Sequence, residues 1–105
     1  MLYSKSLASM KSRRILEKGQ SVYLGCYDYP NGARWLARYN NRFYYIVHDG
    51  TGNQFFHSHA PEEISETEAK RILAETFEGN ELEEALNELD IEIKEEEIDK
   101  LLGLA

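Results

Sequence analysis

Residues 20–60 constrain the fold most, because four short runs rich in Tyr, Phe, Trp, Val and Ile alternate with three turn signals. The runs are 20–28, 33–39, 42–48 and 54–60, and the turn signals are Pro30-Asn31-Gly32, Asn40-Asn41 and the loop 49–53. Aromatic and β-branched side chains suit a pleated sheet, and Gly and Asn tolerate the positive φ angles of tight hairpins. The pattern predicts an antiparallel meander of three or four strands.

Turn length decides which residues of neighbouring strands pair. A two-residue turn at Asn31-Gly32 would place Cys26 opposite Ala37, and a second one at Asn40-Asn41 would place Ala37 opposite Tyr44. Because side chains alternate between the two faces of a strand, this register predicts one core face. Its members are Val22, Leu24, Cys26, Trp35, Ala37, Tyr39, Tyr44 and Ile46.

The opposite face of the predicted sheet would be aromatic and would carry two arginines. It comprises Tyr23, Tyr27, Tyr29, Arg34, Leu36, Arg38, Phe43, Tyr45 and Val47. Six of these residues are candidate binding residues: Tyr23, Tyr27, Arg34, Arg38, Phe43 and Tyr45. Aromatic rings could stack nucleic-acid bases while arginines hold phosphates. The same residue types are also enriched where proteins pack against each other, which is the interpretation we favour.

Length and composition place the chain among small single-domain proteins. A chain of 105 residues can bury one core, and its single cysteine, Cys26, cannot form an internal disulfide. We expect Cys26 to be a small buried apolar residue. No run of about 18 apolar residues suggests a membrane span, and the N-terminus lacks the apolar stretch of a secretory signal. We therefore expect one cytoplasmic α+β domain.

The net charge of −7 is unevenly distributed along the chain. Residues 1–19 carry five cations and one acid, giving +4, and residues 20–60 carry three cations and two acids, giving +1. Residues 61–105 carry sixteen acids and four cations, giving −12. Apolar residues keep helical spacing through this acidic part, which predicts ordered acidic helices and not a disordered tail.

Four helices are predicted around the meander. The first helix is predicted over residues 4–18, where Leu7, Met10 and Ile15 lie near one side. Gly19 would be its C-terminal cap. Pro61 would end the fourth strand. Ser65-Glu66-Thr67-Glu68 has the spacing of a capping box and predicts a helix over 66–78 closed by Gly79. Further helices are expected over 80–89 and from about 94 to 102, with Ile91 and Ile93 in an extended lead-in or at the start of the latter.

Histidine chemistry has little support in the sequence. His57 and His59 would share one side of a strand, but the predicted hairpin leaves His48 about 13 Å or more away, too far to share a zinc ion. His57 and His59 are thus weak metal candidates, and Glu62, Glu63 or a partner chain could complete such a site. No nucleophile with a neighbouring base is identifiable, so a metal- or histidine-dependent hydrolase ranks below two non-enzymatic functions. No cofactor is expected.

The favoured function is protein–protein interaction, either with a second copy or with a basic partner that engages an acidic helical surface. The candidate residues of that surface are Glu81, Glu84, Glu88, Glu95 and Glu96. The alternative is nucleic-acid binding through the Tyr/Arg face and the basic N-terminal segment. The acidic helices would repel a polyanion unless they lie on the far side of the sheet, so this alternative ranks second.

Overall fold

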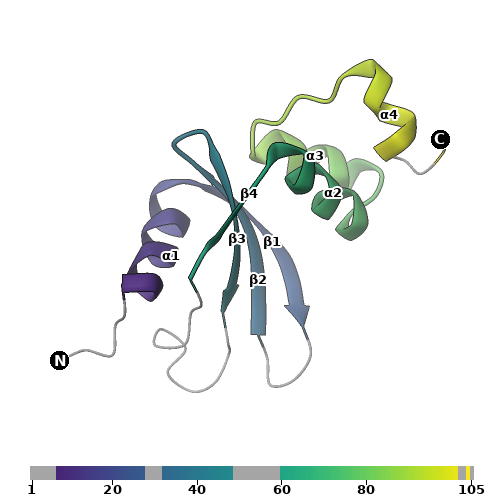
Figure 1. Cartoon of the computed structure of the whole chain (residues 1–105). Coiled ribbons are helices and arrows are strands. Elements are labelled where there is room, and N and C mark those ends of the chain that lie inside the picture. The colour runs from purple at the N-terminus through teal and green to yellow at the C-terminus, as the bar shows by residue number, and fades with distance from the viewer. Residues whose placement is uncertain (1–6, 28–31, 49–59, 102–103, 105) are drawn as a thin grey trace.

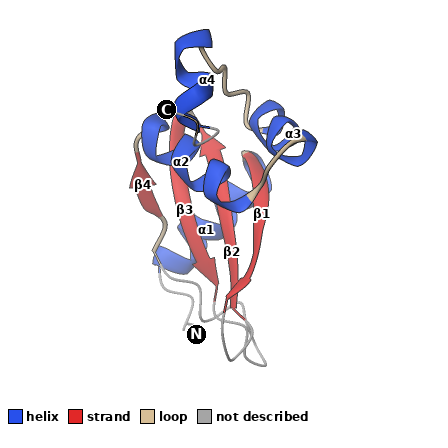
Figure 2. Ribbon diagram, turned by 90° about the vertical axis from the view of Figure 1, so that its right-hand side faces the viewer, coloured by secondary structure: helices blue, strands red, loops and turns tan. Residues whose placement is uncertain are grey.

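The computed structural model describes residues 7–27, 32–48, 60–101 and 104 and has an α+β fold (Figure 1). The elements are α1 (Leu7–Lys18), β1 (Gln20–Tyr27), β2 (Gly32–Tyr39), β3 (Arg42–His48), β4 (Glu62–Ile64), α2 (Glu66–Thr76), α3 (Asn80–Glu88) and α4 (Glu95–Leu101). The strands form one antiparallel sheet in the order β1-β2-β3-β4, as the sequence predicts. Helix α1 lies on one side of this sheet, and α2 lies on the other (Figure 2).

The β2–β3 hairpin has the predicted register. Asn40 and Asn41 have φ angles of 53° and 62°, which identify a tight turn with both central residues in the left-handed region. Ala37 pairs with Tyr44 and Trp35 with Ile46. The predicted faces of these two strands are therefore confirmed.

The predicted register of the first hairpin is wrong. Tyr27 pairs with Gly32, so four residues separate the strands, and Gly32 belongs to β2 instead of forming a two-residue turn with Asn31. Cys26 consequently lies opposite Ala33 and not Ala37. A bulge between Tyr23 and Gly25 shifts the register once more. An insertion of this kind changes which face each side chain of the strand occupies.

The corrected register exchanges the faces predicted for the first half of β1. Val22 pairs with Leu36, and Tyr23 pairs with Trp35. Val22 and Leu24 therefore belong to the face that was expected to be the aromatic surface, and Tyr23 belongs to the face that was expected to be the core. The side chains of Cys26, Tyr27 and residue 29 lie outside the described part of the chain.

Helices cover both faces of the sheet, so there are two cores and not the single core face expected. The larger core joins the sheet to α2, α3 and the segment after them, and its buried members are Leu24, Leu36, Phe43, Ala69, Leu73, Leu82, Ala85, Leu89 and Ile91. The smaller core joins the other face to α1 through Ile15, Ala37, Tyr44 and Ile46. Burial of these side chains is the main stabilising term of the fold.

Helix α1 is confirmed over the described residues 7–18, but the predicted apolar stripe is not. Leu7 and Met10 are 82% and 53% exposed, whereas Ile15 is buried and Ser12 shares the inner side with it. Gly19 follows the helix, and its N–H donates to the Ile15 carbonyl at 2.8 Å. A Cβ atom there would lie 2.4 Å from the Arg38 carbonyl oxygen, so glycine is required for the close approach of α1 to β2.

Ser65 caps α2 as predicted, since its hydroxyl accepts a hydrogen bond from the Glu68 N–H at 3.1 Å. The Glu68 carboxylate pairs with Arg71. Gly79 does not close α2, which ends at Thr76. With a φ of 61°, Gly79 instead precedes α3 as its N-cap.

The fourth strand is displaced from its predicted position. Strand β4 spans Glu62–Ile64, so Pro61 precedes the strand instead of ending it. Ala60 lies outside any strand, and the rest of the predicted strand 54–60 lies outside the described residues. The sequence did not predict this strand because two of its three residues, Glu62 and Glu63, are acidic. A three-residue edge strand needs only one apolar residue that faces the core. Here that residue is Ile64, which pairs with Phe43.

Helices α3 and α4 are confirmed. Ile91 is buried and belongs to the larger core, and Ile93 packs against that core. Residues 91–94 adopt no regular structure, so Ile91 and Ile93 precede α4 and do not begin it.

Candidate interaction surface

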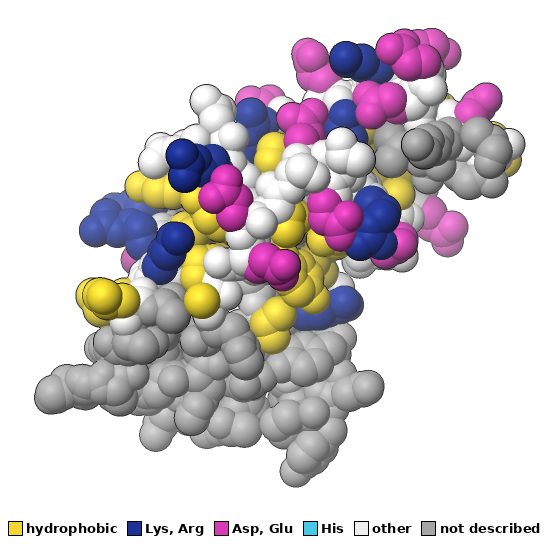
Figure 3. All heavy atoms as spheres, in the orientation of Figure 1, with side chains coloured by type: hydrophobic (Ala, Val, Ile, Leu, Met, Phe, Trp, Pro, Cys, Tyr) yellow, Lys and Arg dark blue, Asp and Glu magenta, His cyan; other side chains and the backbone are white. Residues whose placement is uncertain are grey.

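The two signs of charge separate in space as well as along the chain (Figure 3). Lys and Arg side chains gather over α1, and Asp and Glu side chains predominate over α2, α3 and α4. The sheet lies between α1 and α2. The sheet therefore separates the basic side chains of α1 from the acidic side chains of α2.

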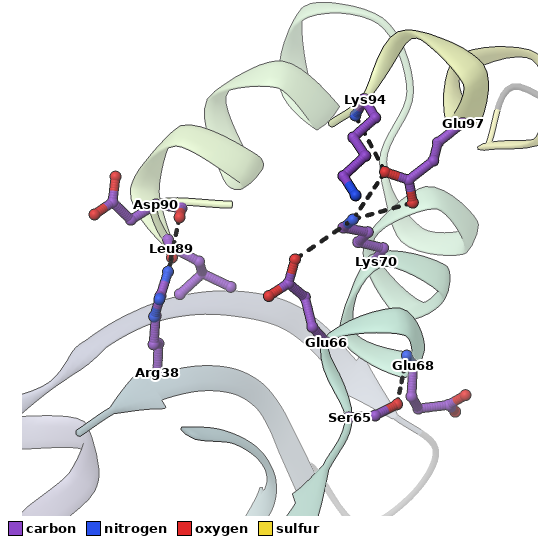
Figure 4. A network of polar contacts seen from close by, with 9 residues as sticks. All are labelled: Arg38, Ser65, Glu66, Glu68, Lys70, Leu89, Asp90, Lys94 and Glu97. Carbon is purple, nitrogen blue, oxygen red and sulfur yellow. Dashed lines mark hydrogen bonds and ion pairs between the residues drawn. The ribbon is translucent and has the colours of Figure 1, made fainter. Parts of the chain in front are cut away.

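The arginines of the predicted Tyr/Arg face lie beneath the C-terminal helices. Arg38 donates from Nη1 to the carbonyl oxygens of Leu89 and Asp90 at 3.0 and 2.7 Å, and these two residues directly follow α3 (Figure 4). Arg34 donates from Nη2 to the Leu24 carbonyl at 3.2 Å. Both guanidinium groups thus bind the protein's own backbone.

The four predicted aromatic residues do not form one exposed platform. Phe43 is buried at 4% exposure, and Tyr45 is half-buried against the same core. Tyr23 lies on the opposite face, where its ring is 4.9 Å from that of Trp35. The Tyr27 side chain lies outside the described residues. The structure therefore brings together Arg34, Arg38, Phe43 and Tyr45, but beneath helices, and places Tyr23 elsewhere.

Three of the five predicted acidic residues share one side of α3. Glu81, Glu84 and Glu88 are exposed and line a shallow hollow of about 290 Å³, which is also lined by Ser21, Val22, Phe77 and Ala85. Spacings of three and four residues place side chains on one side of a helix. Among the described residues, no ion pair involves these three glutamates. We call this hollow the α3–β1 groove.

The α3–β1 groove borders a free edge of the sheet. Strand β1 is the terminal strand, and within the described chain its outer edge pairs with no other strand. Its eight residues include no charged residue and no proline, which are two of the features that protect exposed edges; a third feature, a bulge, is present between Tyr23 and Gly25. Ser21 and Val22 point to opposite faces, so a hollow lined by both reaches the edge itself.

The other two predicted acidic residues, Glu95 and Glu96, are exposed in the first turn of α4. Helix α4 is held to α2 by Lys70, whose side chain is only 10% exposed and whose Nζ lies 3.1 Å from both carboxylate oxygens of Glu97 (Figure 4). Glu66 adds a second contact to Nζ at 3.4 Å. Glu95 and Glu96 therefore belong to a different part of the surface from the α3–β1 groove.

Attraction between opposite charges keeps both Lys70 and Glu97 ionised in this contact. Burial alone would lower the pKa of Lys70, but hydrogen bonds and charge from Glu97 and Glu66 outweigh it and raise that pKa. A hydrogen bond from the Lys94 backbone N–H, with a further one from Lys70, lowers the pKa of Glu97. The contact is thus a charged pair at neutral pH.

The described residues contain no group of three His, Cys, Asp or Glu side chains that could hold a metal ion. The weak metal candidates His57 and His59, and the side chain of His48, lie outside those residues. No described helix has the length and apolar character that crossing a bilayer requires. No family model, curated protein or solved structure matches this chain.

Sequence reasoning found the acidic residues of the α3–β1 groove but not the groove. Helical periodicity is sufficient to place Glu81, Glu84 and Glu88 on one side of a helix. Their position beside β1 depends on how α3 packs on the sheet and on which strand is at the edge. The absence of charge and proline in residues 20–27 was the available signal for an edge strand that could pair with another chain.

Proposed function

We propose that this protein binds a basic polypeptide segment in the α3–β1 groove. The observation that carries the proposal is the position of Glu81, Glu84 and Glu88, which have no ion pair among the described residues, beside the uncharged outer edge of β1. Lysine or arginine side chains would meet the carboxylates, and the backbone of an extended segment would add to the sheet edge. Electrostatic complementarity would supply specificity and the rate of encounter.

A foreign basic segment fits this groove better than a second copy of the chain. Antiparallel pairing of two β1 edges would place the two α3 helices on the same face of the joined sheet. Their glutamates would then repel each other. Homodimerisation through β1 is therefore the less favoured form of the interaction, and light scattering on the purified protein would detect it.

Nucleic-acid binding through the Tyr/Arg face ranks behind this proposal. Stacking on Phe43 would require removal of the helices that bury it, and the Nη1 atom of Arg38 already binds two carbonyl oxygens. A single-stranded oligonucleotide that binds the wild type, and fails to bind a folded Arg34→Glu/Arg38→Glu variant, would reverse this order.

The charge component can be tested with a labelled peptide in which Lys and Thr alternate over eight residues, the length of β1. Replacing Glu81, Glu84 and Glu88 together by Gln should weaken binding about tenfold at low salt, since exposed ion pairs contribute ~0.2–1 kcal/mol each. The matched control replaces Glu78, Glu83 and Glu92, which are exposed and lie outside the groove. Equal losses in both variants would show binding to diffuse charge and contradict the proposal.

The backbone component can be tested with two further peptides that carry N-methyl groups either on every Lys amide or on every Thr amide. A strand hydrogen-bonds to a given neighbour through every second residue. One methylated peptide should therefore retain binding and the other should lose it. Equal binding of the two peptides would exclude addition to the β1 edge.

A further inference from the structure

A second hollow lies beside α1, on the face of the sheet opposite α2, and its lining is basic. It has a volume of about 400 Å³ and is lined by Lys11, Arg14, Ile15, Tyr39, Asn40, Arg42 and Tyr44. Three of these seven residues are cations and none is an acid. We call it the α1–hairpin pocket, because it joins α1 to the β2–β3 turn.

Local structure explains why the three cations converge. Lys11 and Arg14 are three residues apart in α1 and therefore share one side of that helix. Ile15, which is 2% exposed, anchors α1 on the sheet. The tight turn at Asn40-Asn41 then places Arg42, the first residue of β3, at the same end of the pocket.

The cations of the α1–hairpin pocket are largely available for a ligand. Arg14 has no ion pair or hydrogen bond within the described chain. Lys11 Nζ lies 5.8 Å from the centre of the Tyr44 ring, which a cation can leave at little cost when it is exposed. Arg42 lies 3.8 Å from Glu63, and both side chains are more than half exposed, so water screens this pair strongly.

We propose that the α1–hairpin pocket binds the phosphate group of a small phosphorylated ligand. A phosphate monoester carries close to two negative charges near neutral pH and several strong acceptor oxygens. Two guanidinium forks and one ammonium group supply matching donors, and arginine binds phosphate oxygens through paired hydrogen bonds. Tyr39 and Asn40, which also line the pocket, carry further polar groups.

The dimensions and surroundings of the pocket favour a small ligand over a nucleic-acid chain. The site is concave and offers three cations, whereas a long polyanion would also meet the field of a protein with a net charge of −7. That field is screened over about 10 Å at 0.1 M salt, so a single phosphate held among local cations is little affected. A carboxylate would use fewer of the available donors and should bind more weakly.

The test is a titration of the full chain with inorganic phosphate, adenosine 5′-monophosphate and adenosine, followed by NMR at the backbone amides of Asn40 and Arg42. Both phosphate-bearing probes should give saturable shifts at these amides, and adenosine should not. Acetate should bind at least about fivefold more weakly than phosphate, since it offers one charge and two oxygens. Absence of saturable shifts with phosphate, or equal affinity for acetate, would overturn the proposal.

A matched pair of variants locates the site. Arg14→Gln should weaken phosphate binding about tenfold, the usual effect of losing a charged hydrogen bond. Lys18→Gln makes the same change of charge on α1 at an exposed residue outside the pocket, and it should alter binding less than about twofold. Equal losses in the two variants would indicate diffuse attraction to α1 and not a pocket. Replacement of Glu81, Glu84 and Glu88 by Gln should leave phosphate binding unchanged.

Discussion

At the residue scale, Arg38 shows how a side chain predicted to bind a ligand can instead hold the fold together. Aromatic neighbours and a strand position made it a candidate phosphate ligand in the sequence. In the structure its guanidinium donates to the carbonyls of Leu89 and Asp90 and lies 5.1 Å from the centre of the Phe43 ring. Because Leu89 is fully buried, its carbonyl has no easy access to water.

Arg38→Met should lower the free energy of unfolding by about 1–3 kcal/mol, because it removes the donor to the carbonyl of the buried Leu89, directly after α3. Urea denaturation measures this loss. Arg42→Met is the control, since the exposed Arg42 side chain makes a screened ion pair with Glu63, worth ~0–1 kcal/mol, and no other ion pair among the described residues. Equal stability of the two variants would contradict the role assigned to Arg38.

Gly19→Ala should also destabilise the protein, for a different reason. The added methyl group would lie 2.4 Å from the Arg38 carbonyl oxygen and 2.9 Å from that of Ile15, so α1 must move away from β2. Overpacking of this kind costs about 1–3 kcal/mol. Thermal unfolding of the Gly19→Ala variant measures this cost. Glu17→Ala, at an exposed site on α1, is the control. A melting temperature equal to that of wild type would show that the close approach is not required.

At the element scale, the sequence predicts structure well where local signals act and poorly where packing decides. The Asn40-Asn41 turn and the Ser65 cap are local, and both are confirmed. The faces of β1 depend on a longer connection and on a bulge, for which Gly25 inside the strand, with a φ of 104°, was the available signal. Strand β4 forms because Ile64 meets Phe43 in the folded sheet, although Glu62 and Glu63 do not favour a strand.

Helix α4 should separate from α2 at both extremes of pH. The lowered pKa of Glu97 means that its contribution is present above the unfolded pKa of about 4.3 and is lost as pH falls through the folded pKa. The raised pKa of Lys70 means that its contribution is present below about 10.4 and is lost as pH rises through the folded pKa. Hydrogen exchange at the Ile98 backbone amide, compared with exchange at the Leu36 amide in the sheet, measures this separation.

In the Glu97→Gln variant, α4 should already be loosened from α2 at neutral pH. Lowering the pH should then cause no further separation of the two helices. Glu96→Gln changes the same charge at a neighbouring exposed residue and should preserve the wild-type pH profile. If exchange at Ile98 follows the same pH dependence in Glu97→Gln as in wild type, the Lys70–Glu97 pair does not hold α4 in place.

At the scale of the whole molecule, the fold converts a charge gradient along the chain into two separated surfaces. Charge counting predicts opposite signs at the two ends, and helical periodicity predicts that the acidic part is ordered. Neither shows that the basic cluster forms a pocket with Tyr39 and Tyr44, or that the acids of α3 flank the edge of β1. Those juxtapositions arise only when α1 and α3 pack on the sheet.

Binding of a basic segment in the α3–β1 groove is tested most directly by an NMR map of wild-type protein titrated with the Lys-Thr peptide. We predict that the largest amide shifts fall on residues 20–23 of β1 and 81–88 of α3, with α1 and α4 unaffected. Shifts centred on α4, or spread evenly over every acidic helix, would contradict binding of a basic segment at the edge of the sheet.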